Sequence, residues 1–138
     1  MRALILALCL ATPATAQMVF DRAPGLYGSA TDPFQSCDTN PHTLSFTGRP
    51  NHLILRWQSR RPDPEGRMSS EEVYDLRDAT DSTLMMQREG DARLPETGQR
   101  PLWILRLTPD GYCMGRSDWP LVRCVNAAIR CGNDAPIS

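Results

Sequence analysis

Residues 43–58 read TLSFTGRPNHLILRWQ, and this stretch decides the fold class that the sequence predicts. Apolar side chains alternate with polar ones in residues 43–47 and again in residues 52–58. A period of two is typical of a β-strand with one buried face. Residues 48–51, GRPN, separate the two runs and are typical turn formers. The stretch therefore predicts a β-hairpin.

Further strands are predicted on both sides of this hairpin. Four segments alternate in the same way, namely residues 72–78, 83–89, 102–107 and 112–114, and Gly25-Leu26-Tyr27-Gly28 begins the ordered part before them. Polar residues 60–67 are expected to form a solvated loop. A sheet of six or seven short strands in sequence order has to cover its edges or close. We therefore expect a mainly β fold, either a small antiparallel up-and-down barrel or a curved half-barrel.

The C-terminal part changes its period. Its apolar residues are spaced as one face of a helix: Leu121, Val122, Val125, Ala128 and Ile129. Asp118 can cap the start of a helix, and Gly132 stands just past its end. We therefore expect one C-terminal amphipathic helix over residues 119–131. A loop tied down by disulfides is the alternative.

The first 16 residues have the order of a secretory signal peptide. Arg2 precedes an apolar run over residues 3–11, and Ala14-Thr15-Ala16 offers small residues to a signal peptidase. The run is too short to span a bilayer, which takes about 20 residues. The expectation is cleavage before Gln17 and a periplasmic or secreted protein.

The remaining 122 residues fit one domain of ordinary size. We expect residues 17–24 to be a loosely held lead-in and residues 25–138 to form a single disulfide-bonded β domain. These 122 residues contain 14 arginines and 16 acidic residues, a net charge of −2, so the chain has no electrostatic footprint for nucleic acid. The chain contains no lysine, which favours a bacterial periplasm. No later apolar run is long enough for a transmembrane segment.

Four cysteines follow the signal segment, and an even number in an exported chain predicts two disulfides. If residues 119–131 are helical, Cys124 and Cys131 lie about 10.5 Å apart, too far for a bond. We expect Cys37–Cys131 with Cys113–Cys124, and the other arrangement left open is Cys37–Cys124 with Cys113–Cys131. The spacing has no Cys-x-x-Cys pair, which argues against zinc and redox chemistry.

The outline of the domain resembles the lipocalins and related calycins. The resemblance lies in Gly25-Leu26-Tyr27, the meander of strands, and a C-terminal helix tied by cysteine. Tyr27 stands where that family carries tryptophan, and the family's later Thr-Asp-Tyr turn is absent. The resemblance implies a barrel and, as an alternative function, a carrier of a small apolar ligand.

Candidate binding residues are the arginines that alternate with the apolar faces, and an aromatic residue beside one of them. We single out Arg56, Arg106, Arg116 and Trp119, because arginine and tryptophan dominate binding hot spots. The alternatives are arginines that pair with acidic residues on the surface, and a Trp119 that packs on the barrel rim.

The two histidines suggest one more possibility. His42 and His52 flank the first hairpin, and a metal site shared with Asp38 is one interpretation of them. No pattern assigns a catalytic residue, a cofactor or a metal. The function we predict is a non-enzymatic binding or interaction module whose partner is an unknown protein or small ligand. The alternatives are the lipocalin-like carrier and a metal-dependent or hydrolytic site at the His42/His52 hairpin.

Overall fold

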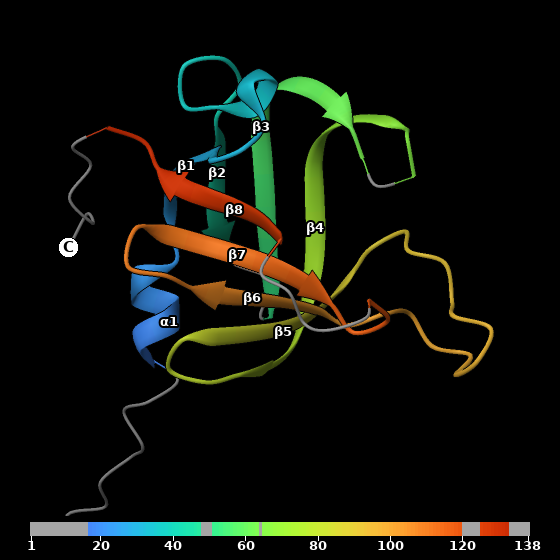
Figure 1. Ribbon diagram of the computed structural model, residues 1–138. Coiled ribbons are helices and arrows are strands. Elements are labelled where there is room, and N and C mark those ends of the chain that lie inside the picture. Colours follow the sequence, from blue (N-terminus) through green and yellow to red (C-terminus); the bar gives the residue numbers. More distant parts are fainter. Residues whose placement is uncertain (1–16, 48–50, 64, 120–124, 133–138) are drawn as a thin grey trace, which may run out of the picture.

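The computed structural model describes residues 17–47, 51–63, 65–119 and 125–132, whose arrangement is shown in Figure 1. Within them eight strands form a closed antiparallel barrel in sequence order, so the mainly β fold is confirmed and the closed barrel, not the curved half-barrel, is the form it takes. The elements are α1 (Gln17–Arg22), β1 (Gly25–Ser29), the 3-10 turn η1 (Pro33–Gln35), β2 (His42–Phe46), β3 (His52–Pro62), β4 (Met68–Ala79), β5 (Thr83–Arg88), β6 (Trp103–Leu107), β7 (Gly111–Arg116) and β8 (Val125–Arg130). No described helix is long and apolar enough to cross a membrane.

The first hairpin is confirmed as β2 and β3. Leu44 lies opposite Leu55 and Phe46 opposite Leu53, so the apolar residues of both strands share the inner face. Leu53 and Leu55 are almost completely buried. Their burial in the barrel is worth about 1.5–3 kcal/mol each, which fixes the register, because a slip by one residue would turn both outward.

Strands β4 to β7 lie where alternation predicted them, but β3 and β4 are longer than expected. Residues 60–67 are not entirely a loop: β3 continues to Pro62, which pairs with Met68 on β4. A register shift between Arg56 and Arg61 accompanies this extension. Such an irregularity re-aims side chains at a barrel rim. It carries Arg61 to a partly buried position, where side-chain exposure is 16%.

The prediction of a C-terminal helix at residues 119–131 is wrong. Residues Val125–Arg130 form strand β8, and residues 120–124 lie outside the described residues. The physical reason is the barrel itself. A helix there would leave β1 and β7 with unpaired edges, whereas β8 pairs antiparallel with both. The helix in the described residues is α1, at the other end of the chain.

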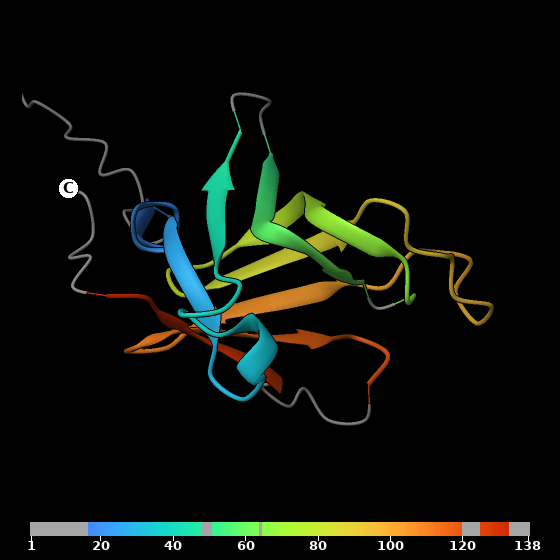
Figure 2. The ribbon, with the colours of Figure 1, turned by 90° about the horizontal axis from the view of Figure 1, so that it is seen from above.

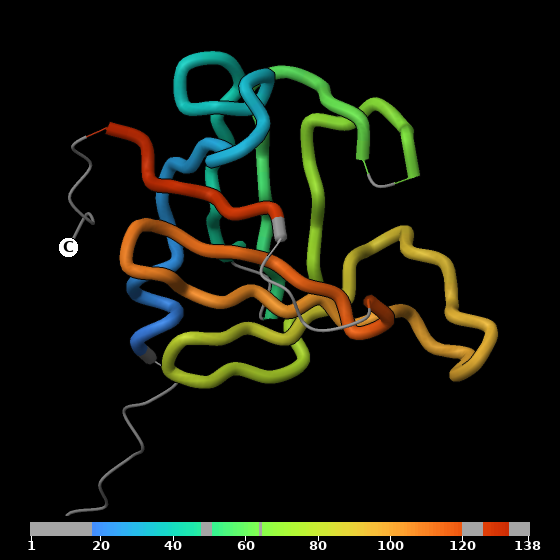
Figure 3. The backbone as a smooth tube through the Cα atoms, viewed as in Figure 1, coloured from blue at the N-terminus to red at the C-terminus, as the bar shows by residue number. Residues whose placement is uncertain are grey.

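Closure brings the two ends of the domain side by side, as the path of the chain in Figure 3 shows. Gly28 on β1 and Gly111 on β7 both lie opposite Ile129 on β8. A Cβ atom on Gly111 would lie 1.9 Å from the carbonyl oxygen of Ala128, so only glycine permits this approach of β7 to β8.

The lead-in expected at residues 17–24 contains helix α1, which packs against the barrel. Val19 and Ala23 are fully buried in the core, and the rings of Phe20 and Phe46 lie 5.0 Å apart. The hydroxyl of Tyr27 donates to the carbonyl oxygen of Ala23 at 2.7 Å. Figures 1 and 2 show α1 on one side of the molecule and the loop after β5 on the opposite side. Apolar burial therefore fastens this segment to one end of the barrel.

Cys37 and Cys131 form a disulfide, as predicted, with their Cα atoms 5.3 Å apart. The helix on which the choice of pairing partly depended is absent, so this pairing follows from chain closure instead. Cys131 comes directly after β8, and its amide donates to the carbonyl oxygen of Leu26 on β1. Cys113 is not a free thiol, whereas its expected partner Cys124 lies outside the described residues. One of the two expected disulfides is therefore seen.

We predict that replacing Cys37 and Cys131 together by serine lowers the free energy of unfolding by about 2–5 kcal/mol, because the bond closes a long loop in the unfolded chain. The sequence separation is 94 residues. Urea unfolding of the oxidised variant and wild type measures the difference. Phe34→Ser is the control, since Phe34 is 81% exposed. Equal midpoints for wild type and the double variant would contradict the prediction.

Candidate functional site

A cavity of about 190 Å³ lies inside the barrel at the end opposite α1. Every strand except β5 contributes to its lining. Ser29 and Thr31 stand at its edge. The side chains that carry its chemistry are His42, Trp57, Arg61, Glu72, Tyr74 and Tyr112. The barrel therefore has an apolar core towards α1 and a polar chamber at its other end.

His42 is the first residue of β2 and points inward in phase with Leu44. The residue is 5% exposed, and its Nε2 atom lies 2.5 Å from the hydroxyl oxygen of Tyr112. Burial, assisted by the charge of Arg61, lowers the pKa of His42 from 6.5 to about 4. The imidazole is therefore neutral at neutral pH. Its Nδ1 atom has no hydrogen-bond partner among the described residues.

Arg61 forms the second part of the chamber. Its guanidinium lies 3.6 Å from the centroid of the Trp57 ring and donates to Glu72 at 2.6 Å. The other carboxylate oxygen of Glu72 accepts from the hydroxyl of Tyr74, also at 2.6 Å. Burial, with Glu72 as the next cause, raises the pKa of Tyr74 well above its usual value, so the phenol stays protonated. The Nε atom of Arg61 is buried and has no partner in the described part of the chain.

A second ionic network supports the chamber wall. The Nε atom of Arg88 donates to Asp91 at 2.7 Å, and the indole N–H of Trp103 donates to the same carboxylate at 2.6 Å. Arg88 also pairs with Glu65 and lies 3.7 Å from Glu72. Burial disfavours the charge of Arg88, but the hydrogen bonds to Asp91 and Glu65 outweigh it and raise its pKa. Trp103 lines the cavity, so the network fixes one wall of the chamber.

The arginines singled out from the sequence do not gather into one patch. Arg56 is exposed on the outer face of β3 and pairs with Glu71 at 2.7 Å. Arg106 is exposed on β6, which is separated from β3 by two strands. Arg116 and Trp119 do meet, with the guanidinium 5.7 Å from the indole centroid, and Trp119 packs edge-on against Trp103. Arg116 is also paired with Asp118.

The two histidines are not brought together. His42 pairs with Trp57 in the ladder, whereas His52 stands at the opposite end of the same hairpin beside the turn. His42 is inside the barrel, and His52 on the outer face contacts Asp75 at 2.9 Å. Asp38 is not part of the one group of possible metal ligands found among the described residues. A metal site shared by His42, His52 and Asp38 is therefore wrong.

Sequence reasoning singled out His42, but for a metal site at the hairpin, and it did not select Arg61, Glu72 or Tyr74. Glu72 is in phase with Tyr74, and Arg88 is in phase with Met86, so each had to point inward with its apolar neighbour. His42 is likewise in phase with Leu44. Arg61 carried no such signal, because it lies beyond the register shift of β3.

The buried histidine generates a prediction for pH. The unfolded chain takes up a proton at His42 near pH 6.5 and the folded protein only at about pH 4, so the folded state loses stability as pH falls through this window. The full effect is on the order of 3 kcal/mol. Two-dimensional NMR should show the His42 ring neutral until about pH 4. A titration midpoint near 6.5 would contradict the burial of a neutral imidazole.

The chamber has to be interpreted from its own geometry. No protein-family model matches the chain, and no match is found among the curated proteins or the solved structures. The eight-stranded barrel therefore describes the fold alone and assigns no function. The resemblance of Gly25-Leu26-Tyr27 to the lipocalins stays a prediction.

Proposed function

We propose that this protein binds a small organic ligand in the polar chamber of its barrel. The observation that carries the proposal is a pair of buried nitrogen atoms, His42 Nδ1 and Arg61 Nε, that have no hydrogen-bond partner among the described residues and belong to side chains that line one cavity. Buried polar atoms are almost always hydrogen-bonded, and one left without a partner costs about 1–3 kcal/mol. A ligand that bonds to these nitrogens removes that cost on binding.

The size of the chamber limits the ligand. A volume of about 190 Å³ is below the range of roughly 300–1,000 Å³ that drug-sized ligands occupy. Leu55 and Trp57 belong to its lining, while Met86 and Leu105 are buried in the core and do not. These features support a compact ligand with polar groups over the extended apolar ligand of a lipocalin-like carrier.

The charges of the chamber indicate the chemistry of that ligand. Arg61 is neutralised by Glu72, and His42 is uncharged, so neither anions nor cations are attracted strongly. The Nε–H group of Arg61 needs an acceptor, and an uncharged carbonyl or hydroxyl oxygen supplies one. Tyr112 and Trp57 provide flat apolar surfaces beside it. An uncharged molecule with a hydrogen-bond acceptor next to a ring is the class that fits best.

We further propose that the protein acts in the periplasm or outside the cell, without catalysing a reaction. The proposal is supported by the signal-like residues 1–16 and by the Cys37–Cys131 disulfide, since such bonds persist in oxidising compartments. A second disulfide, Cys113–Cys124, belongs to the same proposal.

A matched pair of arginine variants tests the ligand site. Arg61 and Arg56 both lie on β3 and both pair with a glutamate of β4, but only Arg61 lines the chamber. A library of uncharged and anionic compounds of about ten heavy atoms is screened by ligand-observed NMR. We expect uncharged compounds to bind with micromolar to millimolar affinity. Their affinity should fall at least tenfold in Arg61→Gln and stay unchanged in Arg56→Gln. The absence of hits, or equal loss in both variants, would contradict the proposal.

Expression of the full chain in a bacterium with a periplasm tests the compartment. We expect the protein in the periplasmic fraction with Gln17 as its first residue, and a Cys113–Cys124 peptide in a non-reducing digest. Recovery from the cytoplasm with Met1 in place would show that residues 1–16 do not direct export.

A further inference from the structure

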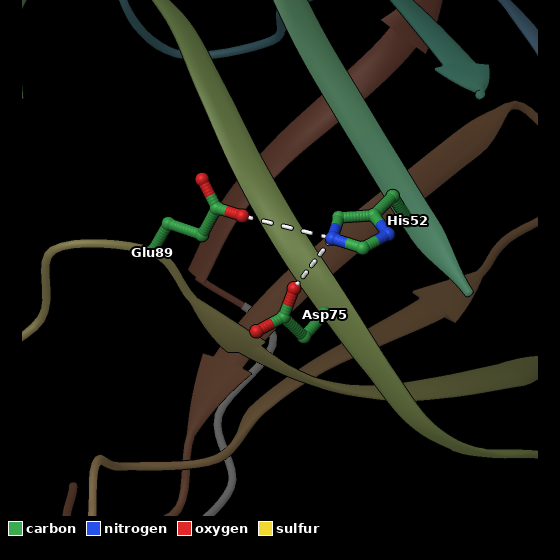
Figure 4. A group of neighbouring side chains, drawn as sticks. All are labelled: His52, Asp75 and Glu89. Carbon is green, nitrogen blue, oxygen red and sulfur yellow. Dashed lines mark ion pairs between the residues drawn. The ribbon is translucent and has the colours of Figure 1, made fainter. Parts of the chain in front are cut away.

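The outer wall of the barrel carries a cluster that is separate from the chamber. His52, Asp75 and Glu89 come from the start of β3, the middle of β4 and the residue after β5, and Figure 4 shows their side chains converging on one point. One ligand atom from each residue lies within 4.8 Å of the other two. Two of the distances are 2.9 Å, from His52 Nε2 to Asp75, and 3.6 Å, from the same nitrogen to Glu89.

The sheet itself holds these residues in place. His52 lies directly opposite Asp75 in the ladder between β3 and β4. Glu89 donates its amide to the carbonyl oxygen of Val73, which places it diagonally across from Asp75 on β4. Each of the three alternates with an inward-facing neighbour, so all three point to the outer face. Sites built on strands are held more rigidly than sites on loops.

One nitrogen atom of the His52 imidazole contacts both carboxylates. The Nε2 atom of His52 carries at most one proton, and the 2.9 Å contact gives it to Asp75. The 3.6 Å separation from Glu89 is too long for a hydrogen bond. Two carboxylates nevertheless face one nitrogen. A cation between the three atoms would interact favourably with all of them.

We propose that His52, Asp75 and Glu89 bind a divalent first-row metal ion of the Zn²⁺ type. Zinc bonds of about 2.0–2.2 Å in tetrahedral geometry separate neighbouring ligand atoms by about 3.4 Å, which lies between the two measured distances. One imidazole and two carboxylates suit such an ion better than Ca²⁺ or Mg²⁺, which take oxygen ligands. Glu89 is 51% exposed at its side chain, so water completes the coordination.

Neighbouring groups agree with this assignment. Arg100 lies 3.5 Å from the second carboxylate oxygen of Asp75, so it orients the carboxylate while the first oxygen faces His52. Outer partners of this kind are usual around metal ligands. The site does not depend on the ligand proposed for the chamber, because none of its three residues lines that cavity.

The test uses the oxidised protein, freed of metal by a chelator, and zinc chloride as the probe. Calorimetry should show one strong site per chain, and zinc should shift the NMR resonance of His52 Nε2. His42, the second of two histidines, is the internal control and should not shift. His52→Gln and Glu89→Gln should each weaken binding at least tenfold, while Asp81→Asn, an exposed carboxylate in a turn, should leave it unchanged.

Three results would overturn the proposal. The first is no binding at zinc concentrations up to about 1 mM, the range in which weak surface sites bind. The others are equal zinc affinity in wild type and Glu89→Gln, and an NMR shift at His42 in place of His52. Glu89→Gln keeps the test valid if His52→Gln fails to fold, because Glu89 is half exposed and follows the end of β5.

Discussion

Every feature of this structure depends on closure of the sheet, in which β8 pairs with both β1 and β7. An open sheet of this kind exposes two rows of unpaired backbone groups, and closure satisfies them within one chain. The pairing also places Cys131 beside β1, from where it bonds to Cys37. In a closed barrel, alternate side chains of each strand point inward or outward. The inward ones form the core and the chamber, and the outward ones form the outer wall.

The chamber is the part of the interior that stability alone does not explain. A barrel end filled with apolar side chains would cost less than one that buries Arg61 with Glu72 and Arg88 with Asp91, since ion pairs lose hydration on burial. Each charge is paired, so the networks are tolerated. Two nitrogen atoms of the lining are nevertheless left without partners among the described residues. This combination, a polar wall with unsatisfied groups in side chains that line a cavity, supports the ligand site that we propose.

The sequence predicted the fold where one pattern had one interpretation. Strict alternation in residues 43–58 predicted the hairpin and its inner face, and the even number of cysteines predicted disulfides, of which Cys37–Cys131 is seen. The helix prediction failed at residues 125–130, because the apolar residues of VNAAIR suit one face of a helix as well as a strand. The choice of strand comes from the edges of β1 and β7, with which β8 pairs. Glu72 and Arg88 were predictable from their phase, whereas Arg61 depended on a register shift that has no local signal.

Adjacent residues of an extended chain point to opposite faces, as Arg88 at the end of β5 and Glu89 directly after it show for the two clusters. Arg88 turns inward to the network behind the chamber, and Glu89 turns outward to His52. Arg100 touches both, because it donates to the carbonyl oxygen of Arg88 at 3.2 Å and lies 3.5 Å from Asp75. The wall between the two sites is one strand thick, so a displacement of the end of β5 has to alter the contacts on both faces. The rigidity of the closed barrel therefore serves the inner and the outer clusters together.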